Sequence, residues 1–108
     1  MTRRRADIDR VFHALGDRTR RAMLDRLRRG PVSVSQLAAL LGITLTAVGQ
    51  HLEILEASGL AATEKVGRVR TCRMASAGLD ALEKWVHEHR TEWEQRMDSL
   101  KNLLDGEE

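Results

Sequence analysis

A short stretch of this sequence combines side chains that suit packing with side chains that suit hydrogen bonding, at a spacing that would place them on opposite sides of a helix. At about 100° per residue, a helix that begins after Thr44 has one apolar arc, formed by Leu45, Val48, His51, Leu52 and Leu55. Its other arc is formed by Thr46, Gly49, Gln50, Glu53 and Ala57. Gln50 can form two hydrogen bonds with adenine, Thr46 can bond a base or a phosphate, and the methyl group of Ala47 can meet a thymine methyl group. We expect His51, on the apolar arc, to pack in the core.

Basic side chains in a second stretch could contact the phosphates beside those bases. Lys65, Arg68 and Arg70 surround Gly67 in a segment whose Val, Thr and Arg residues lack helical spacing. This composition predicts a β-hairpin, and cations at its tip are placed for contacts with phosphates or with the minor groove.

Arginines nearer the N-terminus offer further phosphate contacts. Arg20 and Arg21 lie near the start of a helix that Asp17 can cap, and Arg3–Arg5 form a basic arm. For any single one of these arginines, a solvated charge is at least as good an interpretation.

The charges of the chain are unevenly distributed, although their sum is only +2. Residues 1–78 hold 14 Lys and Arg against 7 Asp and Glu, whereas residues 79–108 hold 4 against 9. A basic body with an acidic tail predicts that one face meets a polyanion, and a solvated surface of mixed charge is the alternative.

These side chains need elements that hold them, and the sequence predicts one domain that is mainly α-helical with a small β-hairpin wing. The expected order is α-α-α-α-β-β-α, with helices at residues 7–15, 17–29, 34–41, 45–58 and 77–104 and strands at 61–66 and 68–74. Ser33 and Gln36 form a capping-box pattern, and residues 33–58 have the order of a helix-turn-helix. Residues 1–6 form the basic arm, and residues 60–74 form the wing.

The expected last helix carries an apolar stripe that one small domain cannot cover. The stripe lies within an arc of about 120° and comprises Leu79, Leu82, Trp85, Val86, His89, Trp93, Met97, Leu100, Leu103 and Leu104. A stripe of this size is unfavourable in water, and a twofold partner with the same stripe would cover it. We therefore predict a homodimer that forms through residues 77–104, with a helix folded back on its own domain as the alternative.

Three runs of the sequence, in this order and spacing, resemble the ArsR/SmtB family of winged-helix transcriptional repressors. Residues 12–27, FHALGDRTRRAMLDRL, are similar to the family's ALxDxTRxxILxxL run. Residues 46–60, TAVGQHLEILEASGL, are similar to its AVSxHLxxLxxAGLV recognition helix, and residues 67–74, GRVRTCRM, to its GRxxxYRL wing. The resemblance implies a dimer that places two recognition helices in successive major grooves, about one DNA turn apart. The residues of each such helix and its cap that we then expect at the DNA are Thr44, Thr46, Ala47, Gly49, Gln50 and Glu53.

Three residues depart from the family pattern. Gly49 stands where Ser or Thr is usual, Glu53 where Lys or Arg is frequent, and Cys72 where an aromatic residue is common. Because glycine is unfavourable inside a helix, Gly49 suggests that a phosphate or a base edge approaches the backbone closely. Glu53 puts the usual phosphate contact in doubt, although it could accept a hydrogen bond from a cytosine amino group.

Both metal-sensing motifs of the family are missing. The thiolate motif ELCVCDL corresponds to Pro31–Leu37, where Ser33 and Ser35 replace the cysteines and cannot hold a soft metal. The motif of the last helix would begin at Asp80, and its other positions are Leu82, Trp93 and Arg96. We expect neither a metal site nor a cofactor.

Other residues leave a sensing role open. His89 with Glu92, or His87 with Glu83, could form half of a metal site across a dimer, and Cys72 could be oxidised between molecules. The preferred interpretation is that His89 packs in the dimer interface, that His87 is solvated and that Cys72 is a small hydrophobic residue of the interior. Trp85 and Trp93 could also wall a small apolar pocket for an organic effector, although such a pair is more often core.

These patterns predict a sequence-specific regulator of transcription, most plausibly a homodimeric repressor on a pseudopalindromic operator. The sequence shows no nucleophile–base pair, phosphate-binding glycine loop or carboxylate cluster, so we do not expect an enzyme. No apolar run suits a membrane span or a signal peptide, and the single cysteine forms no internal disulfide, so we expect a cytoplasmic protein. The alternatives are a sensor with a non-standard metal or thiol site and a winged-helix module that binds protein.

Overall fold

Two short helices open the part of the chain that the computed structural model describes, residues 7–106. Helix α1 (Ile8–Leu15) begins at Asp7, whose side chain accepts a hydrogen bond from the backbone of Asp9. Helix α2 (Arg18–Leu27) begins at Asp17, as predicted, and ends at Leu27, two residues earlier than expected. The basic arm at residues 1–6 lies outside the described residues.

The predicted helix-turn-helix is confirmed as α3 (Val34–Leu41) and α4 (Leu45–Ala57), whose axes differ by 110°. Ser33 and Gln36 form the expected capping box, in which each side chain bonds the backbone of the other residue. Gly42 ends α3 at a φ of 68°, which only glycine adopts without strain. The capping box and Gly42 therefore set the two ends of α3.

The wing belongs to a three-stranded antiparallel sheet in the order β1-β3-β2. Strands β2 (Ala61–Val66) and β3 (Val69–Met74) form the predicted hairpin around Gly67. Strand β1 (Val32–Ser33), in which Val32 faces Cys72 of β3, was not expected from the sequence. Two residues are too few to show a strand pattern, so β1 exists because β3 offers it an edge.

The core lies between α1–α4 and the base of the sheet. Its largest fully buried hydrophobic side chains come from each of these elements, and they are Val11, Met23, Leu27, Leu37, Val48, Leu55, Leu60 and Cys72. Leu45 is an exception to the predicted apolar arc of α4, because it is the first residue of the helix and is exposed. The core therefore fixes the inner side of α4 and leaves its outer side in solvent.

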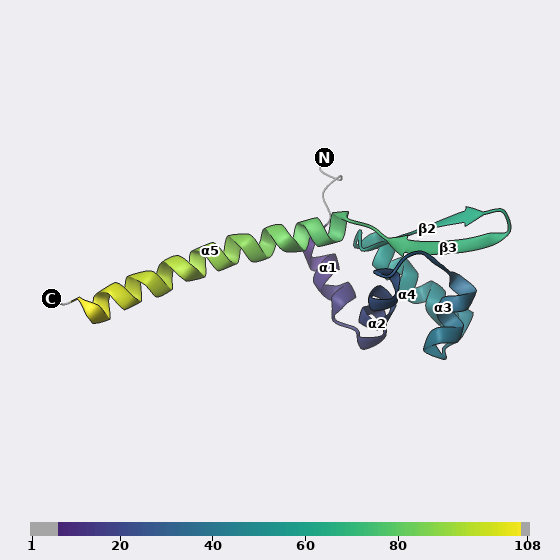
Figure 1. Cartoon of the computed structure of the whole chain (residues 1–108), viewed down its shortest axis with the longest axis horizontal. Coiled ribbons are helices and arrows are strands. Elements are labelled where there is room, and N and C mark those ends of the chain that lie inside the picture. The colour runs from purple at the N-terminus through teal and green to yellow at the C-terminus, as the bar shows by residue number, and fades with distance from the viewer. Residues whose placement is uncertain (1–6, 107–108) are drawn as a thin grey trace.

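Helix α5 (Ala77–Asp105) leaves this body and extends away from it on the side opposite to the wing (Figure 1). The molecule is consequently elongated, with extents of 71 × 35 × 20 Å. The first turns of α5 lie against α1. Within the described residues, no single helix is both long and apolar enough to cross a membrane; α3 and α4 meet that length and composition only as a bent pair.

Candidate nucleic-acid interface

Helix α4 presents a polar outer side because its cap and its core contacts fix its orientation. The side chain of Thr44 accepts a hydrogen bond from the backbone N–H of Ala47 at 3.0 Å, which satisfies one of the free donors at the start of the helix. Val48, Leu52 and Leu55 are buried on the inner side. Thr46, Gln50 and Glu53 are exposed on the outer side, as predicted.

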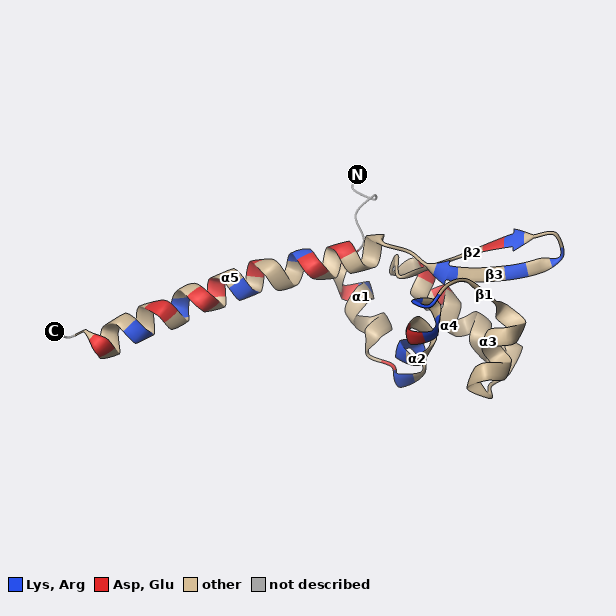
Figure 2. Ribbon diagram, viewed as in Figure 1, with Lys and Arg blue, Asp and Glu red and all other residues tan. Residues whose placement is uncertain are grey.

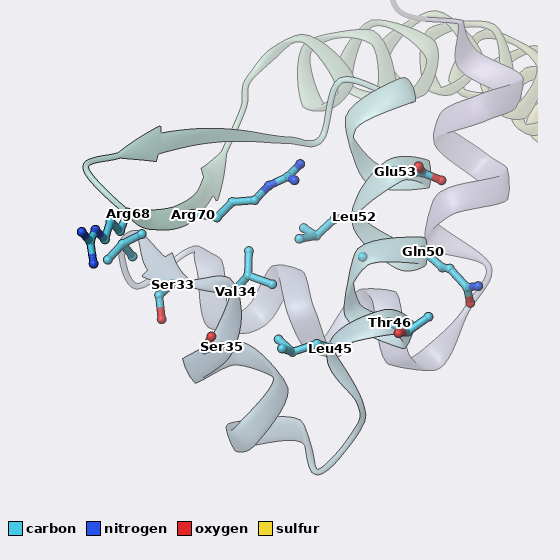
Figure 3. Close-up of a pocket in the computed structure, with 12 residues that line it drawn as sticks. Ser33, Val34, Ser35, Leu45, Thr46, Gln50, Leu52, Glu53, Arg68 and Arg70 are labelled. Atoms are coloured by element: carbon cyan, nitrogen blue, oxygen red, sulfur yellow. The ribbon is translucent and has the colours of Figure 1, made fainter.

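A groove of about 730 Å³ lies between this side of α4, the start of α3 and the wing. Figure 3 shows the residues that line it. Six of the predicted DNA-contacting residues line the groove, namely Thr46, Gly49, Gln50, Glu53, Arg68 and Arg70. Val34, Leu45, Leu52 and Val69 add apolar surface to it, and Ser33 and Ser35 add hydroxyl groups. The structure thus brings residues of α4 and of the wing to one groove, and Figure 3 shows that the side chains of Thr46, Gln50 and Glu53 are directed from α4 away from Arg70.

Three other predicted residues lie outside this groove. The hydroxyl group of Thr44 is used to cap α4, and Ala47 is half-buried. Lys65 is exposed on β2, where it faces Arg70 of β3 in the register of the hairpin.

The positive charge at this surface comes from the wing rather than from the helix-turn-helix. Helix α3 has no charged residue, and α4 has only the acidic Glu53 and Glu56. Figure 2 shows Lys and Arg gathered toward the end of the hairpin, where Lys65, Arg68 and Arg70 lie. Any electrostatic attraction of a polyanion to this side must therefore act mainly through the wing.

Gly49 has no close neighbour in the chain itself. A Cβ atom added at this position would meet nothing within 4 Å. The absence of a side chain is therefore not required by packing, and it leaves the backbone of α4 open toward the groove.

Arg20, which was considered for a phosphate contact, is instead buried, with only 7% of the residue exposed. Its guanidinium group donates to the backbone oxygens of Ala14 at 2.9 Å and His13 at 3.1 Å. Its Nη1 atom lies 3.3 Å from Nδ1 of His51 on α4. Arg20 thus joins the end of α1 to the recognition helix. The basic run around Arg20 in the sequence gave no sign of which arginine would turn inward.

His51 is half-buried, so the predicted core position is only approximate, and its contacts are polar. Because arginine can only donate, Arg20 can hydrogen-bond Nδ1 of His51 only when that nitrogen carries no hydrogen. Oδ2 of Asp17 lies 4.0 Å from the same Nδ1. The pKa of Asp17 is lowered, mainly because its carboxylate accepts a hydrogen bond from the backbone N–H of Arg20, and the charge of Arg20 adds to this effect.

The apolar stripe of α5 is largely in solvent in the single chain. Trp93 is 62% exposed and Leu104 is 75% exposed, and the large side chains between them are exposed as well. Leu82 differs from the rest of the stripe because it packs partly against the core of its own chain.

Phe12 extends this stripe onto α1, which the sequence analysis missed. The rings of Phe12 and Trp85 meet edge to face, with their centroids 5.0 Å apart. His89 stacks on Trp85 from the next turn, and its Nδ1 lies 2.8 Å from the Trp85 carbonyl oxygen. Phe12 follows the buried Val11 in the sequence, and its exposed fraction of 41% identifies it as part of this face.

The residues considered for sensing do not form a site within one chain. Among residues 7–106, no three His, Cys, Asp or Glu side chains are placed to hold a metal ion. Cys72 is fully buried, and its thiol lies 3.2 Å from the carbonyl oxygen of Val32, to which it can donate. Burial raises the pKa of this thiol, so Cys72 is held in its unreactive protonated form. Oxidation between molecules would require the sheet to open first.

The chain is similar in sequence to known regulators of transcription. A family model described as a helix-turn-helix domain matches residues 15–64. The HTH-type transcriptional regulator Rv2034 of Mycobacterium tuberculosis is 34% identical over 99 residues, which cover 92% of this chain and 90% of that protein.

Two solved structures extend this likeness to the whole fold. An ArsR-like transcriptional regulator from Rhodococcus sp. RHA1 is 34% identical with a TM-score of 0.82, and the match covers 94% of this chain and 93% of the other. The homodimeric winged helix-turn-helix DNA-binding domain of Mb0332 from Mycobacterium bovis, a possible ArsR-family regulator, is 31% identical with a TM-score of 0.63. That match covers 79% of this chain and 82% of the other.

Proposed function

Because the chain belongs to the ArsR family of helix-turn-helix transcriptional regulators, we propose that it is a homodimeric repressor of a pseudopalindromic operator. The observation that carries this proposal is the groove in which α4 and the wing meet. Uncharged hydrogen-bonding groups lie on α4, and arginines lie on the wing at its edge. This division suits DNA, whose base edges present donors and acceptors and whose phosphates are anionic.

The outer side of α4 reads the bases of the major groove. Gln50 offers both a donor and an acceptor, which match the edge of adenine. Thr46 contacts a base or a phosphate beside it, and Glu53 accepts from the amino group of cytosine. The open backbone at Gly49 allows the DNA to approach α4 closely.

The wing contacts the phosphates or the minor groove. Lys65 and Arg70 face each other in the register of the hairpin. Like charges that face each other destabilise a hairpin, and a bound anion beside them would offset that cost. The salt-dependent part of the affinity comes from such cations of the wing, and Arg68 at its end contributes to it.

Two copies of the chain associate through α5 and Phe12. The exposed apolar residues of α5, from Leu79 to Leu104, form a face that a second copy would cover with the same residues. Trp85 and Phe12 lie on this face together, so α1 takes part in it. A twofold dimer presents two α4 helices to two half-sites, and repression follows where the operator overlaps the site of RNA polymerase binding.

The test is a salt titration of binding to a fluorescent duplex of random sequence, followed by anisotropy. We expect tight binding at low salt and a negative slope of log affinity against log salt. Arg68→Ala should flatten the slope by about one unit, whereas Arg90→Ala, which removes the same charge from α5, should leave it unchanged. A folded dimer that binds no DNA at low salt would overturn the proposal in favour of a module that binds protein.

A further inference from the structure

A chain of hydrogen bonds joins the recognition helix to the wing. Glu56 lies in the last turns of α4, and its Oε2 atom accepts two hydrogen bonds from Thr63 of β2. One comes from the backbone N–H at 3.1 Å and the other from the hydroxyl group at 2.7 Å. The base of the wing is thus tied to the helix that carries Gln50.

The same hydroxyl group holds Arg70. Nη2 of Arg70 donates to Oγ1 of Thr63 at 3.2 Å. A hydroxyl group has one hydrogen and two lone pairs, so Thr63 can donate to Glu56 and accept from Arg70 at the same time. Because Glu56 fixes the direction of the hydroxyl hydrogen, it also fixes which side of the oxygen Arg70 can bond.

The two arginines of the wing therefore differ in their surroundings. Figure 3 shows Arg70 directed over the groove toward α4, whereas Arg68 lies near the end of the hairpin on the side of Ser33. Arg70 is exposed, and a guanidinium group has five N–H donors, so most of its donors remain available to DNA. A side chain that is already held in one direction loses less entropy on binding, and its fixed donors favour ligands that present acceptors in that direction.

We propose that Thr63 and Glu56 are positioning residues that aim Arg70 at a defined contact beside α4, so that Arg70 contributes to operator specificity and Arg68 to general phosphate affinity. This inference rests on the proposed DNA binding. It assigns a role to two residues that neither the charge pattern nor the groove itself singles out.

The test uses the ratio of affinities for two duplexes, one enriched from a random pool by the wild-type protein and one with the same composition in shuffled order. Thr63→Val removes the hydroxyl group at nearly constant volume and should lower this ratio by roughly five- to tenfold, as expected between residues of one hydrogen-bond network. Thr63→Ser keeps the hydroxyl group and should restore the ratio. Thr71→Val, on the neighbouring strand and outside this hydrogen-bond chain, is the matched control and should change nothing.

A double-mutant cycle separates positioning from a general loss of structure. In an Arg70→Ala background, Thr63→Val should lower the ratio no further, whereas in an Arg68→Ala background it should have its full effect. Urea unfolding should report a similar loss of stability from Thr63→Val in both backgrounds. Equal effects on the ratio in both backgrounds, or an unchanged ratio in Thr63→Val, would overturn the inference while leaving DNA binding intact. Failure of the wild-type protein to bind either duplex would instead overturn the proposed function.

Discussion

The backbone N–H of Gly78 donates a hydrogen bond to the carbonyl oxygen of Gly59 at 2.7 Å, and this contact joins the end of the recognition helix to the start of α5. Gly59 follows α4 with a φ of 77°. Gly78 is buried in the first turn of α5. If two α5 helices form the dimer, this joint transmits their spacing to the two α4 helices.

Gly78→Ala should destabilise the fold, although alanine normally favours a helix. A Cβ atom at this position would lie 2.7 Å from the carbonyl oxygen of Ser58 and 2.8 Å from Cγ of Leu60, so α5 would have to move away from α4. We expect the free energy of unfolding to fall by about 1–3 kcal/mol, as is usual for an overpacked site. Urea unfolding followed by circular dichroism measures it, and a gain in stability would show that the joint is not tight.

Gly49→Ala should have the opposite effect on stability. A Cβ atom would meet no neighbour here, so the gain in helix propensity should raise the free energy of unfolding by about 0.5–1 kcal/mol. The added methyl group would point into the groove and should weaken binding to the enriched duplex. If binding is unchanged while stability rises, the DNA does not approach the backbone of Gly49.

Gln50→Ala should reduce discrimination and not general affinity. The loss of a paired contact to one base should lower the preference for the enriched duplex by about 1–3 kcal/mol, with nearly unchanged affinity for the shuffled duplex. Anisotropy titrations of both duplexes give the two values. An equal loss on both would contradict a role of Gln50 in reading bases.

Trp93→Asp should dissociate the dimer, because it places a charge in the centre of the exposed apolar face of α5. Gln95→Asp adds the same charge two residues away, on the other side of the helix, and should leave the dimer intact. Sedimentation at micromolar concentration distinguishes the two states. A Trp93→Asp protein that remains dimeric would refute this assignment of the interface.

Stability should decline in acid partly through Asp17. Its lowered pKa means that the folded state favours the carboxylate, so its contribution is complete above the unfolded value of about 3.9 and is lost as the pH falls through the folded value. Asp17→Asn keeps the helix cap but has no charge to titrate. Below about pH 4, the unfolding midpoint of Asp17→Asn should therefore depend less on pH than that of the wild-type protein. If the two midpoints depend on pH in the same way, titration of Asp17 does not contribute to the loss of stability in acid.

Most of the fold follows from local patterns in the sequence. Asp17, the pair Ser33 and Gln36, and Gly42 each specify a helix end through their own backbone contacts, so the helix-turn-helix could be placed from sequence to within two residues. The hairpin around Gly67 follows in the same way. Each of these helix ends and turns is specified by residues that are close in sequence, so each could be predicted without the tertiary structure.

What the sequence could not predict depends on contacts between distant residues. Arg20 is buried because the carbonyl oxygens of α1 and the ring of His51 surround it, and His51 lies 31 positions later. Arg70 and Glu56 are joined through Thr63 by side chains of three different elements. An exposed arginine and a buried arginine look alike in a basic run, so only the packed structure separates the two.

Selection of DNA sequences from a random pool by the wild-type protein tests directly whether the chain reads an operator as a twofold pair. We expect an enriched motif with twofold symmetry, whose half-sites lie about 10–10.5 base pairs apart, as two α4 helices in successive major grooves require. If the groove residues read the bases, the motif selected by Gln50→Ala should lose its base preference at one position in each half-site. Recovery of no common sequence, or of a single unsymmetrical site, from a folded and dimeric protein would contradict the claim that this chain reads an operator as a twofold pair.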